Sequence, residues 1–233
     1  MEDYKAFYQN ITGFAPYLYQ EMVWKLLQEG KNVVVSVPTG AGKTWASIMP
    51  FLYAKENGIE SFPQKMIYSL PLRTLTNSIF SDVTTSLLKD SIQYKYPTLN
   101  TLASIQTGEV GDDPYFMKDM IFSTIDQTLS NFLCFPLSIS HSQANINAGS
   151  IIGSYLVFDE FHLLDPQLSM TTTIGMLRML RNLCRVCIIT ATLTDDYITF
   201  LKKELYNFEV VSICDFPDDV KRIKSLVPAA GKK

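Results

Sequence analysis

The chain has 233 residues, of which 47% are hydrophobic and 18% charged, so it can bury a substantial core as one large or two small domains. Its formal net charge of −3 excludes a strongly basic surface, so any nucleic-acid binding must come from local geometry. No apolar run approaches the roughly 20 residues of a membrane span, and the first residues are not a signal peptide. We therefore expect a cytoplasmic protein that makes no membrane contact.

Short apolar runs rich in β-branched residues alternate along the chain with segments of helical periodicity. The expected strands are 33–37, 66–70, 103–106, 120–123, 155–158, 186–190 and 210–213. The expected helices are 17–28, 44–55, 72–88, 126–133, 169–183 and 194–205. This alternation predicts an α/β fold with a mainly parallel central sheet and helices on both faces. Ligands of such sheets bind at the carboxyl ends of the strands.

Two segments depart from this alternation. Residues 135–154 are rich in Ser, Asn, Gln and Gly, which predicts a surface insertion within a domain that covers residues 1–213. The remaining residues, 214–233, are expected to leave the core as a C-terminal linker or flexible tail. Cys184 and Cys187 have the spacing of a metal knuckle or redox pair, but burial at the start of a strand is the favoured interpretation.

The first strand, 33–37, leads into a glycine-rich turn and then into Lys-Thr at the start of a helix. Gly40 and Gly42 allow a tight turn whose N–H groups point at an anion, and the helix N-terminus adds further donors. Lys43 can reach the β- and γ-phosphates of a nucleotide, and the Thr44 hydroxyl can hold Mg²⁺. The sequence therefore predicts an ATP·Mg²⁺ site whose phosphate cradle consists of Thr39, Gly40, Ala41, Gly42, Lys43 and Thr44.

A second group of functional residues follows the strand 155–158. Two adjacent carboxylates at a strand end are costly unless a cation or water network receives them. In a protein with a P-loop, the first, Asp159, binds Mg²⁺ together with Thr44, and Glu160 polarises the attacking water. His162 lies where it can sense the γ-phosphate. We therefore predict that Lys43, Asp159, Glu160 and His162 are the catalytic residues.

The order of these and other motifs resembles that of superfamily 2 helicases of the DEAD/DEAH type. The pattern Pro-Thr-Gly-x-Gly-Lys-Thr, with Val37 where the full P-loop pattern has Gly, is the form found in that superfamily. The matching segments are 17–20 (a Q-like motif), 38–44 (motif I), 70–75 (Ia), 106–108 (Ib), 123–127 (Ic), 159–162 (II) and 190–192 (III). The resemblance implies that residues 1–213 form a RecA-like P-loop NTPase lobe that binds ATP.

The resemblance also assigns roles to residues outside the phosphate cradle. Gln20 would read the adenine base, and Thr190 and Thr192 would couple ATP hydrolysis to movement. The residues that would contact single-stranded nucleic acid are Arg73, Thr74, Thr107, Gly108 and Thr124. An alternative for Thr74 and Thr124 is a helix-capping role. The aromatic residues near the N-terminus could stack bases, but packing of a helix or flanking of the adenine is favoured.

Within the superfamily, residues 71–75, 124–129 and 159–165 are most similar to the helicase of CRISPR type I interference, in which a helicase is coupled to an HD nuclease. The chain contains two histidines and no His-Asp dipeptide, so no nuclease is expected within it. It is also too short for the second RecA-like lobe with which this family closes its ATP site. The resemblance therefore implies a first lobe that acts on single-stranded DNA with a second lobe, a separate HD nuclease and a CRISPR surveillance complex as partners.

Two other functions remain open at this point. One is another task within the same superfamily, as the lobe of a restriction-type translocase or of an RNA helicase. The other is an ATP-binding docking or regulatory module with no turnover of its own.

Overall fold

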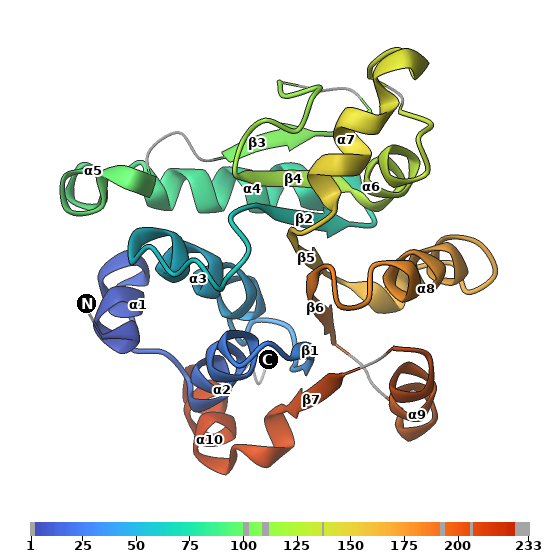
Figure 1. Ribbon diagram of the computed structural model, residues 1–233. Coiled ribbons are helices and arrows are strands. Elements are labelled where there is room, and N and C mark those ends of the chain that lie inside the picture. The colour runs from blue at the N-terminus through green and yellow to red at the C-terminus, as the bar shows by residue number, and fades with distance from the viewer. Residues whose placement is uncertain are drawn as a thin grey trace, which may run out of the picture.

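The computed structural model describes residues 3–99, 103–108, 112–136, 138–191, 194–205 and 207–226. Within these residues, the strands form one parallel seven-stranded sheet in the order β3-β4-β2-β5-β6-β1-β7 (Figure 1). The strands are β1 (Asn32–Ser36), β2 (Met66–Leu70), β3 (Ala103–Gln106), β4 (Met120–Thr124), β5 (Tyr155–Phe158), β6 (Arg185–Thr190) and β7 (Phe208–Ser212). The predicted α/β fold is confirmed.

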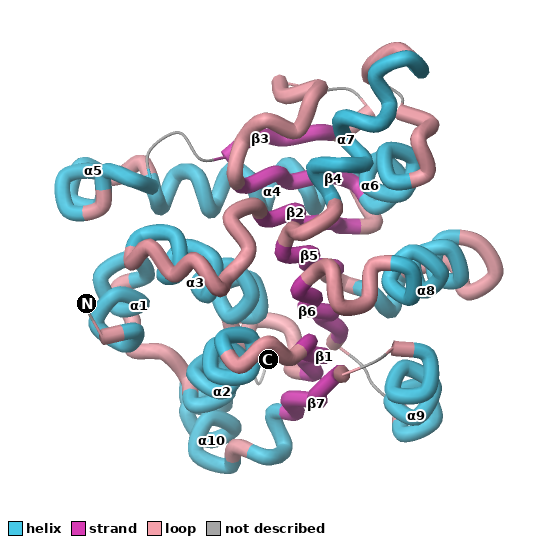
Figure 2. Tube along the Cα trace, in the orientation of Figure 1, coloured by secondary structure: helices cyan, strands magenta, loops and turns pink. Residues whose placement is uncertain are grey.

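Helices cover both faces of the sheet (Figure 2). One face carries α1 (Tyr4–Thr12), α2 (Leu18–Gln28), α3 (Lys43–Glu56), α4 (Arg73–Leu87), α5 (Asp90–Lys95) and α10 (Pro217–Leu226). The other face carries α6 (Ile125–Phe132), α7 (Ala144–Ile151), α8 (Ser169–Met179) and α9 (Asp195–Glu204). Because both faces are covered, the central strands are mostly apolar and do not alternate between apolar and polar residues.

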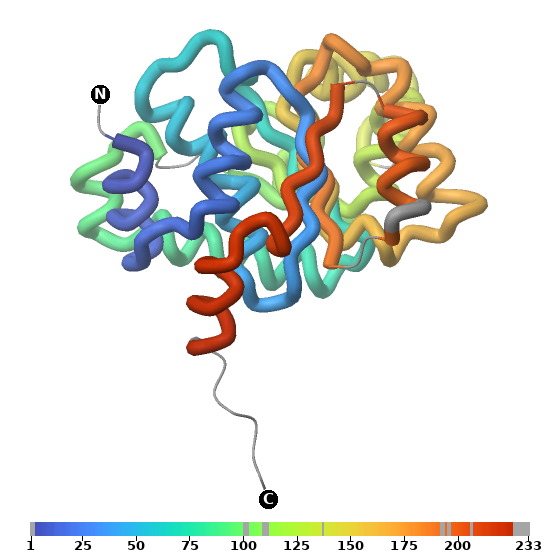
Figure 3. Tube along the Cα trace, turned by 90° about the horizontal axis from the view of Figure 1, so that it is seen from below, coloured from blue at the N-terminus to red at the C-terminus, as the bar shows by residue number. Residues whose placement is uncertain are grey.

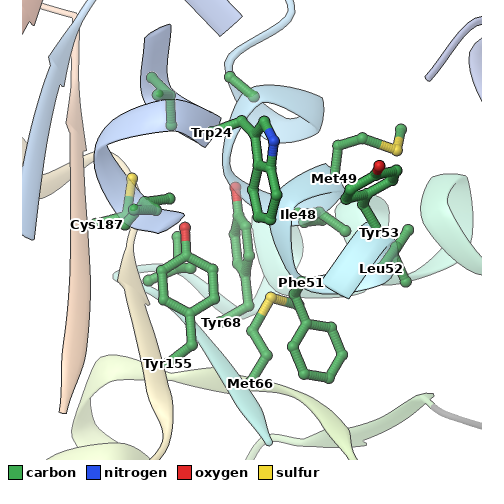
Figure 4. Packing of buried hydrophobic residues seen from close by; sticks show 14 of the residues in the cluster. Trp24, Ile48, Met49, Phe51, Leu52, Tyr53, Met66, Tyr68, Tyr155 and Cys187 are labelled. Carbon is green, nitrogen blue, oxygen red and sulfur yellow. The ribbon is translucent and has the colours of Figure 1, made fainter. Parts of the chain in front are cut away.

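The core is accordingly split into two clusters by the sheet. Val33 and Val35 of β1 belong to the cluster under α2 and α3, whereas Val34 between them belongs to the opposite cluster under α6 and α8. Successive side chains of a strand point to opposite faces, so a run of valines supplies both clusters. Figure 4 shows the first cluster, in which Trp24 and Tyr155 lie with apolar residues of α3.

The two cysteines with metal-knuckle spacing lie in different clusters. Cys187 on β6 is buried beside Tyr155 (Figure 4), and burial raises the pKa of its thiol to about 12. Cys184, which precedes the strand, is buried in the opposite cluster and donates to the carbonyl oxygen of Ile151. The two thiols therefore do not face a common site.

Most expected elements lie within two residues of their predicted ends, and the exceptions have local causes. Helix α8 ends at Met179, four residues before the expected end, and Asn182 beyond it adopts a left-handed conformation. The expected surface insertion, 135–154, contains α7, whose Asn147 donates to the Asn131 side chain on α6 at 2.6 Å. This helix packs against the domain because its buried positions, Ala144, Asn147 and Ile151, recur on one side.

The expectation of a linker or flexible tail at 214–233 requires a correction for residues 217–226, which form α10. Pro217 suits the first position of a helix, and Asp218 and Asp219 favour the positive end of its dipole. Residues 227–233 lie outside the described part of the chain.

Candidate nucleotide site and nucleic-acid interface

The glycine-rich turn joins β1 to α3 at the carboxyl edge of the sheet. Gly40 and Gly42 have φ angles of 80° and 78°, in the left-handed region that glycine adopts without strain. Gly42 also occupies the N-cap of α3, so the unpaired N–H groups of the first helical turn open into the space beside the turn. A Cβ atom on Gly42 would lie 2.9 Å from the Gln20 amide nitrogen, so a larger residue would clash there.

Sheet order determines how the separate motifs meet. Strands β5, β6 and β1 are neighbours, so the turn after β1, Thr190 at the end of β6 and Asp159 just after β5 share one edge. Backbone pairing of Ser36 with Thr190 aligns the ends of β1 and β6. This adjacency brings residues about 120 positions apart in the sequence into contact.

Asp159 is buried, with 2% of its surface exposed. Its carboxylate accepts a hydrogen bond from the Tyr68 hydroxyl at 2.6 Å and another from the Glu160 N–H at 2.7 Å. Burial raises the pKa of Asp159, and the Tyr68 hydrogen bond opposes that rise. The positive charge of Lys43, whose ammonium pairs with Glu160, also opposes the rise in pKa.

Glu160 has a φ of 50°, a left-handed conformation that is strained for a residue with a side chain. Its carboxylate lies 3.2 Å from the Lys43 ammonium and 3.5 Å from Nδ1 of His162. Nδ1 of His162 is in turn 3.4 Å from the Thr190 hydroxyl. The predicted catalytic residues are thus connected in one series of polar contacts from the P-loop to β6.

A cavity of about 340 Å³ lies between the P-loop and the acid pair. Thr39, Gly40, Lys43, Thr44, Asp159 and Glu160 all line it. Lys43 and the N–H groups of α3 supply positive potential for phosphates. The Thr44 hydroxyl and the Asp159 carboxylate are hard oxygen ligands of the kind that Mg²⁺ binds. The residues therefore fit a nucleoside triphosphate with a magnesium ion.

A second cavity of about 270 Å³ shares Gly40, Gly42 and Trp45 with the first. Gln20, which is predicted to read the adenine, lies in the wall of this second cavity. Its side-chain amide is engaged in hydrogen bonds within the protein. The amide oxygen accepts from the Tyr17 N–H at 2.9 Å, and the amide nitrogen donates to the Gly42 carbonyl at 3.0 Å. Gln20 therefore links the α2 N-terminus to the P-loop.

One predicted member of the phosphate cradle is placed less favourably for direct binding. Ala41 is buried, and its N–H donates to the Pro38 carbonyl at 3.3 Å within the turn. Its carbonyl accepts from the Tyr19 hydroxyl at 2.5 Å. Thr192, predicted to act with Thr190, lies outside the described residues.

The predicted nucleic-acid residues lie at the ends of β2, β3 and β4, at the other half of the same edge. The Arg73 guanidinium lies over Gly108, because a Cβ atom added to Gly108 would be 2.5 Å from the guanidinium. The segments 70–75 and 106–108 are therefore adjacent. Thr74 is exposed, and Leu72 occupies the N-cap of α4 without a side-chain cap. Thr107 is buried. Thr124 is also buried and caps α6 by accepting from the Gln127 N–H at 3.4 Å, as the capping alternative predicts.

Three residues that contact the predicted nucleotide site were not predicted from the sequence. Tyr68 donates to Asp159, and Asp219 of α10 accepts from the first two N–H groups of α2. Arg222 of α10 donates to carbonyls of the segment before α2. A tyrosine within an apolar strand resembles any core residue. The α10 contacts join positions about 200 residues apart and leave no local pattern in the sequence.

Comparison with known proteins identifies the class of the chain. Residues 17–200 match the family model described as DEAD/DEAH box helicase, so the chain belongs to this family. Its α/β sheet and ordered motifs are those of a superfamily 2 helicase ATP-binding domain. No helix in the described part of the chain is long and apolar enough to cross a membrane.

Particular relatives include helicases for both DNA and RNA. ATP-dependent DNA helicase Hel308 of Thermoplasma acidophilum is 29% identical over 200 residues, covering 82% of this chain and 26% of the relative. DEAD-box ATP-dependent RNA helicase 16 of Arabidopsis thaliana is 24% identical over 221 residues, covering 91% and 33%. The structure of Mycobacterium smegmatis helicase Lhr bound to ssDNA and AMP-PNP has a TM-score of 0.67 at 19% identity, covering 91% of this chain and 27% of that one. The chain thus spans about a quarter to a third of these relatives' lengths.

Proposed function

We propose that this chain is the ATP-binding lobe of a helicase or translocase that acts on single-stranded DNA. The observation that carries the proposal is the meeting of Lys43 with Glu160 at 3.2 Å beside the buried Asp159. ATP would place its phosphates in the cavity between the P-loop and the acid pair, against Lys43 and the α3 N-terminus. Thr44 and Asp159 would hold Mg²⁺, which neutralises charge on the phosphates when bound.

Hydrolysis would require the side chain of Glu160 to release Lys43. In the described arrangement the Glu160 carboxylate is paired with the Lys43 ammonium. Phosphate oxygens compete for that ammonium, which leaves the carboxylate to accept a proton from water. His162 holds the second carboxylate oxygen from the other side and so keeps Glu160 at the edge of the cavity.

We further propose that hydrolysis needs a second RecA-like lobe, on the same or a separate chain. Transition-state charge in phosphoryl transfer is commonly stabilised by an arginine. Arg178 pairs with Glu204, Arg185 donates to the Leu27 carbonyl, and Arg181 is exposed beyond α8. The other two arginines of the chain, Arg73 and Arg222, lie on α4 and α10. None of the five lines the phosphate cavity, so we expect a second lobe to supply the arginine.

Single-stranded nucleic acid would bind across the loops after β2 and β3. Arg73 and Thr74, which follow β2, are exposed, and Gly108, which follows β3, lies next to the Arg73 guanidinium. The net charge of −3 argues against a broad electrostatic surface and favours a few phosphate contacts. DNA is preferred over RNA on the motif resemblance described above. The same resemblance supports a role in CRISPR type I interference, with a surveillance complex and a separate HD nuclease as partners.

The test is phosphate release by the 233-residue chain at saturating ATP and Mg²⁺. We expect slow turnover by the chain alone and a rise on the order of 10³-fold or more when a second lobe is supplied. Single-stranded DNA should stimulate that reaction further, and single-stranded RNA should not. Fast DNA-stimulated turnover by the chain alone would contradict the need for a second lobe.

A docking or regulatory module is the second candidate, favoured by the pairing of Lys43 with Glu160 and by the positions of the arginines. That function predicts ATP binding with no turnover under any of these conditions. Stimulation by RNA alone would instead indicate an RNA helicase lobe, and stimulation by duplex DNA a restriction-type translocase.

A further inference from the structure

Helix α10 forms one side of the cavity beside the P-loop. The cavity is lined by the aromatic rings of Tyr8, Phe14, Tyr17 and Trp45, and Arg222 of α10 completes its wall. It adjoins the phosphate cavity at Gly40 and Gly42. An aromatic-lined cavity of about 270 Å³ at this position suits the base of a nucleotide whose phosphates lie in the neighbouring cavity.

Arg222 holds the segment that carries Tyr17. Its guanidinium donates to the carbonyl oxygen of Ala15 at 2.8 Å and to that of Pro16 at 3.2 Å. The same group lies 4.4 Å from the centre of the Tyr17 ring, within the range of a cation–π contact. A planar guanidinium can bridge two carbonyls and stack on a ring at once, which a lysine ammonium cannot do.

Asp219, one turn earlier on α10, caps α2 from outside. Its two carboxylate oxygens accept from the N–H groups of Leu18 and Tyr19 at 3.1 and 2.9 Å. These are two of the N–H groups that a helix N-terminus leaves without intrahelical partners. Asp219 is buried, so water does not replace it in this role.

Figure 3 shows α10 beside the start of α2, and the contacts above explain this placement. The contacts fix both ends of the short segment 15–20. Tyr17 lies at its centre, and Gln20 at its end bonds to the Gly42 carbonyl of the P-loop. A displacement of α10 would therefore move the wall of the cavity and the residue that links this wall to the P-loop.

We propose that Asp219 and Arg222 are positioning residues for base recognition: α10 holds the 15–20 segment in the geometry that accepts a purine base. The inference rests on the proposed ATP-binding function and adds to it the support that α10 gives to the base site, which the sequence already places at Gln20. Affinity for the base should depend on α10, whereas affinity for the phosphates should depend on Lys43.

The experiment measures calorimetric affinities of the 233-residue chain for Mg·ATP and for Mg·tripolyphosphate, which has the phosphates but no base. We expect Arg222→Ala to weaken ATP binding about tenfold, because it removes two hydrogen bonds and a ring contact from the cavity wall. Tripolyphosphate binding should remain unchanged. Arg222→Lys should behave like Arg222→Ala, because the planar bridge is lost although the charge remains.

The matched control is Lys221→Ala on the solvent side of the same helix, where Lys221 pairs with the exposed Asp218. It should leave both affinities unchanged. Asp219→Asn, which keeps one acceptor of two, should also weaken ATP binding selectively. Unchanged ATP affinity in Arg222→Ala would overturn the inference, and so would an equal loss of ATP and tripolyphosphate binding, which indicates damage to the whole fold. A wild-type chain that binds neither ligand would overturn the proposed function itself.

Discussion

The centre and one side of the sheet's carboxyl edge are organised differently. At the centre, Lys43, Glu160, His162 and Thr190 are linked by contacts of 3.2–3.5 Å, and Asp159 is buried beside them. At the side formed by β2, β3 and β4, Arg73 and Thr74 are exposed, while the Thr124 side chain caps the N-terminus of α6.

This difference fits the roles proposed above for the two regions. Phosphoryl transfer requires charged groups that are positioned before the substrate arrives, and a sheet interior supplies that rigidity. Backbone recognition of a nucleic acid needs only a few donors at the surface, and its phosphates are numerous and equivalent. We therefore expect large and specific mutational effects at the centre and small, sequence-independent effects at the side.

The largest expected effect is at the P-loop. Lys43→Ala removes the cation that faces the phosphate cavity and leaves Glu160 without its partner, so Mg·ATP affinity should fall on the order of 100-fold or more. Calorimetric titration of Mg·ATP measures this loss. Lys55→Ala, at the other end of α3 and paired with Asp119 at 2.9 Å, is the matched control and should bind ATP normally. Undiminished binding by Lys43→Ala would refute the cavity as the phosphate site.

The next largest effect separates binding from turnover. Glu160→Gln removes the proton acceptor but keeps the shape of the side chain, so turnover should fall by about 10²–10⁴-fold. ATP binding should be kept or tightened, because Lys43 is released from a competing carboxylate. Phosphate release with a second lobe present, together with calorimetry, measures the two properties. Normal turnover would show that another group is the base.

The central region is also the one that the sequence predicts best. Its motifs follow strands β1, β5 and β6 directly. A parallel sheet places the carboxyl ends of its strands at one edge, whatever the length or position of the connecting helices. The contacts of Lys43 with Glu160 and of His162 with Thr190 join residues that were all predicted for this site. Helix α10 could not be predicted in the same way. This helix contacts the site through Asp219 and Arg222, whose partners are about 200 residues away in the sequence.

At the proposed nucleic-acid side, the sequence predicts neither which residues are exposed nor what each one does. Arg73 and Thr74 are exposed, whereas Thr107 and Thr124 are buried. Thr74 is the second residue of α4 and Thr124 is the last residue of β4. From the sequence alone, either could cap a helix or contact a phosphate. Only the backbone conformation distinguishes them, because Leu72 takes the N-cap of α4 whereas Thr124 itself takes that of α6. Capping geometry is determined by how the chain enters each helix.

A moderate effect is expected from the exposed pair. Arg73→Ala combined with Thr74→Ala should weaken binding of single-stranded DNA several-fold at low salt, about equally for all sequences. The slope of affinity against salt concentration should fall by about one phosphate contact. Fluorescence anisotropy with labelled oligonucleotides of different sequence measures both. Arg181→Ala, an exposed arginine beyond α8, is the control, and an equal loss in that variant would place the DNA elsewhere.

The smallest expected effect distinguishes the two threonines and so tests the comparison most closely. Thr124→Ala removes the N-cap acceptor of α6 and should lower the free energy of unfolding by about 1 kcal/mol. Thr124→Ser keeps the hydroxyl and should restore most of that loss. Thr74→Ala, at an exposed position that caps nothing, should leave stability within about 0.5 kcal/mol of the wild type. Urea denaturation of the three variants measures these differences, and DNA affinity measured in parallel should change only for Thr74→Ala. If Thr124→Ala instead weakens DNA binding without loss of stability, Thr124 contacts the nucleic acid. The side formed by β2, β3 and β4 would then also use a buried side chain that is positioned before the ligand binds, as the centre does.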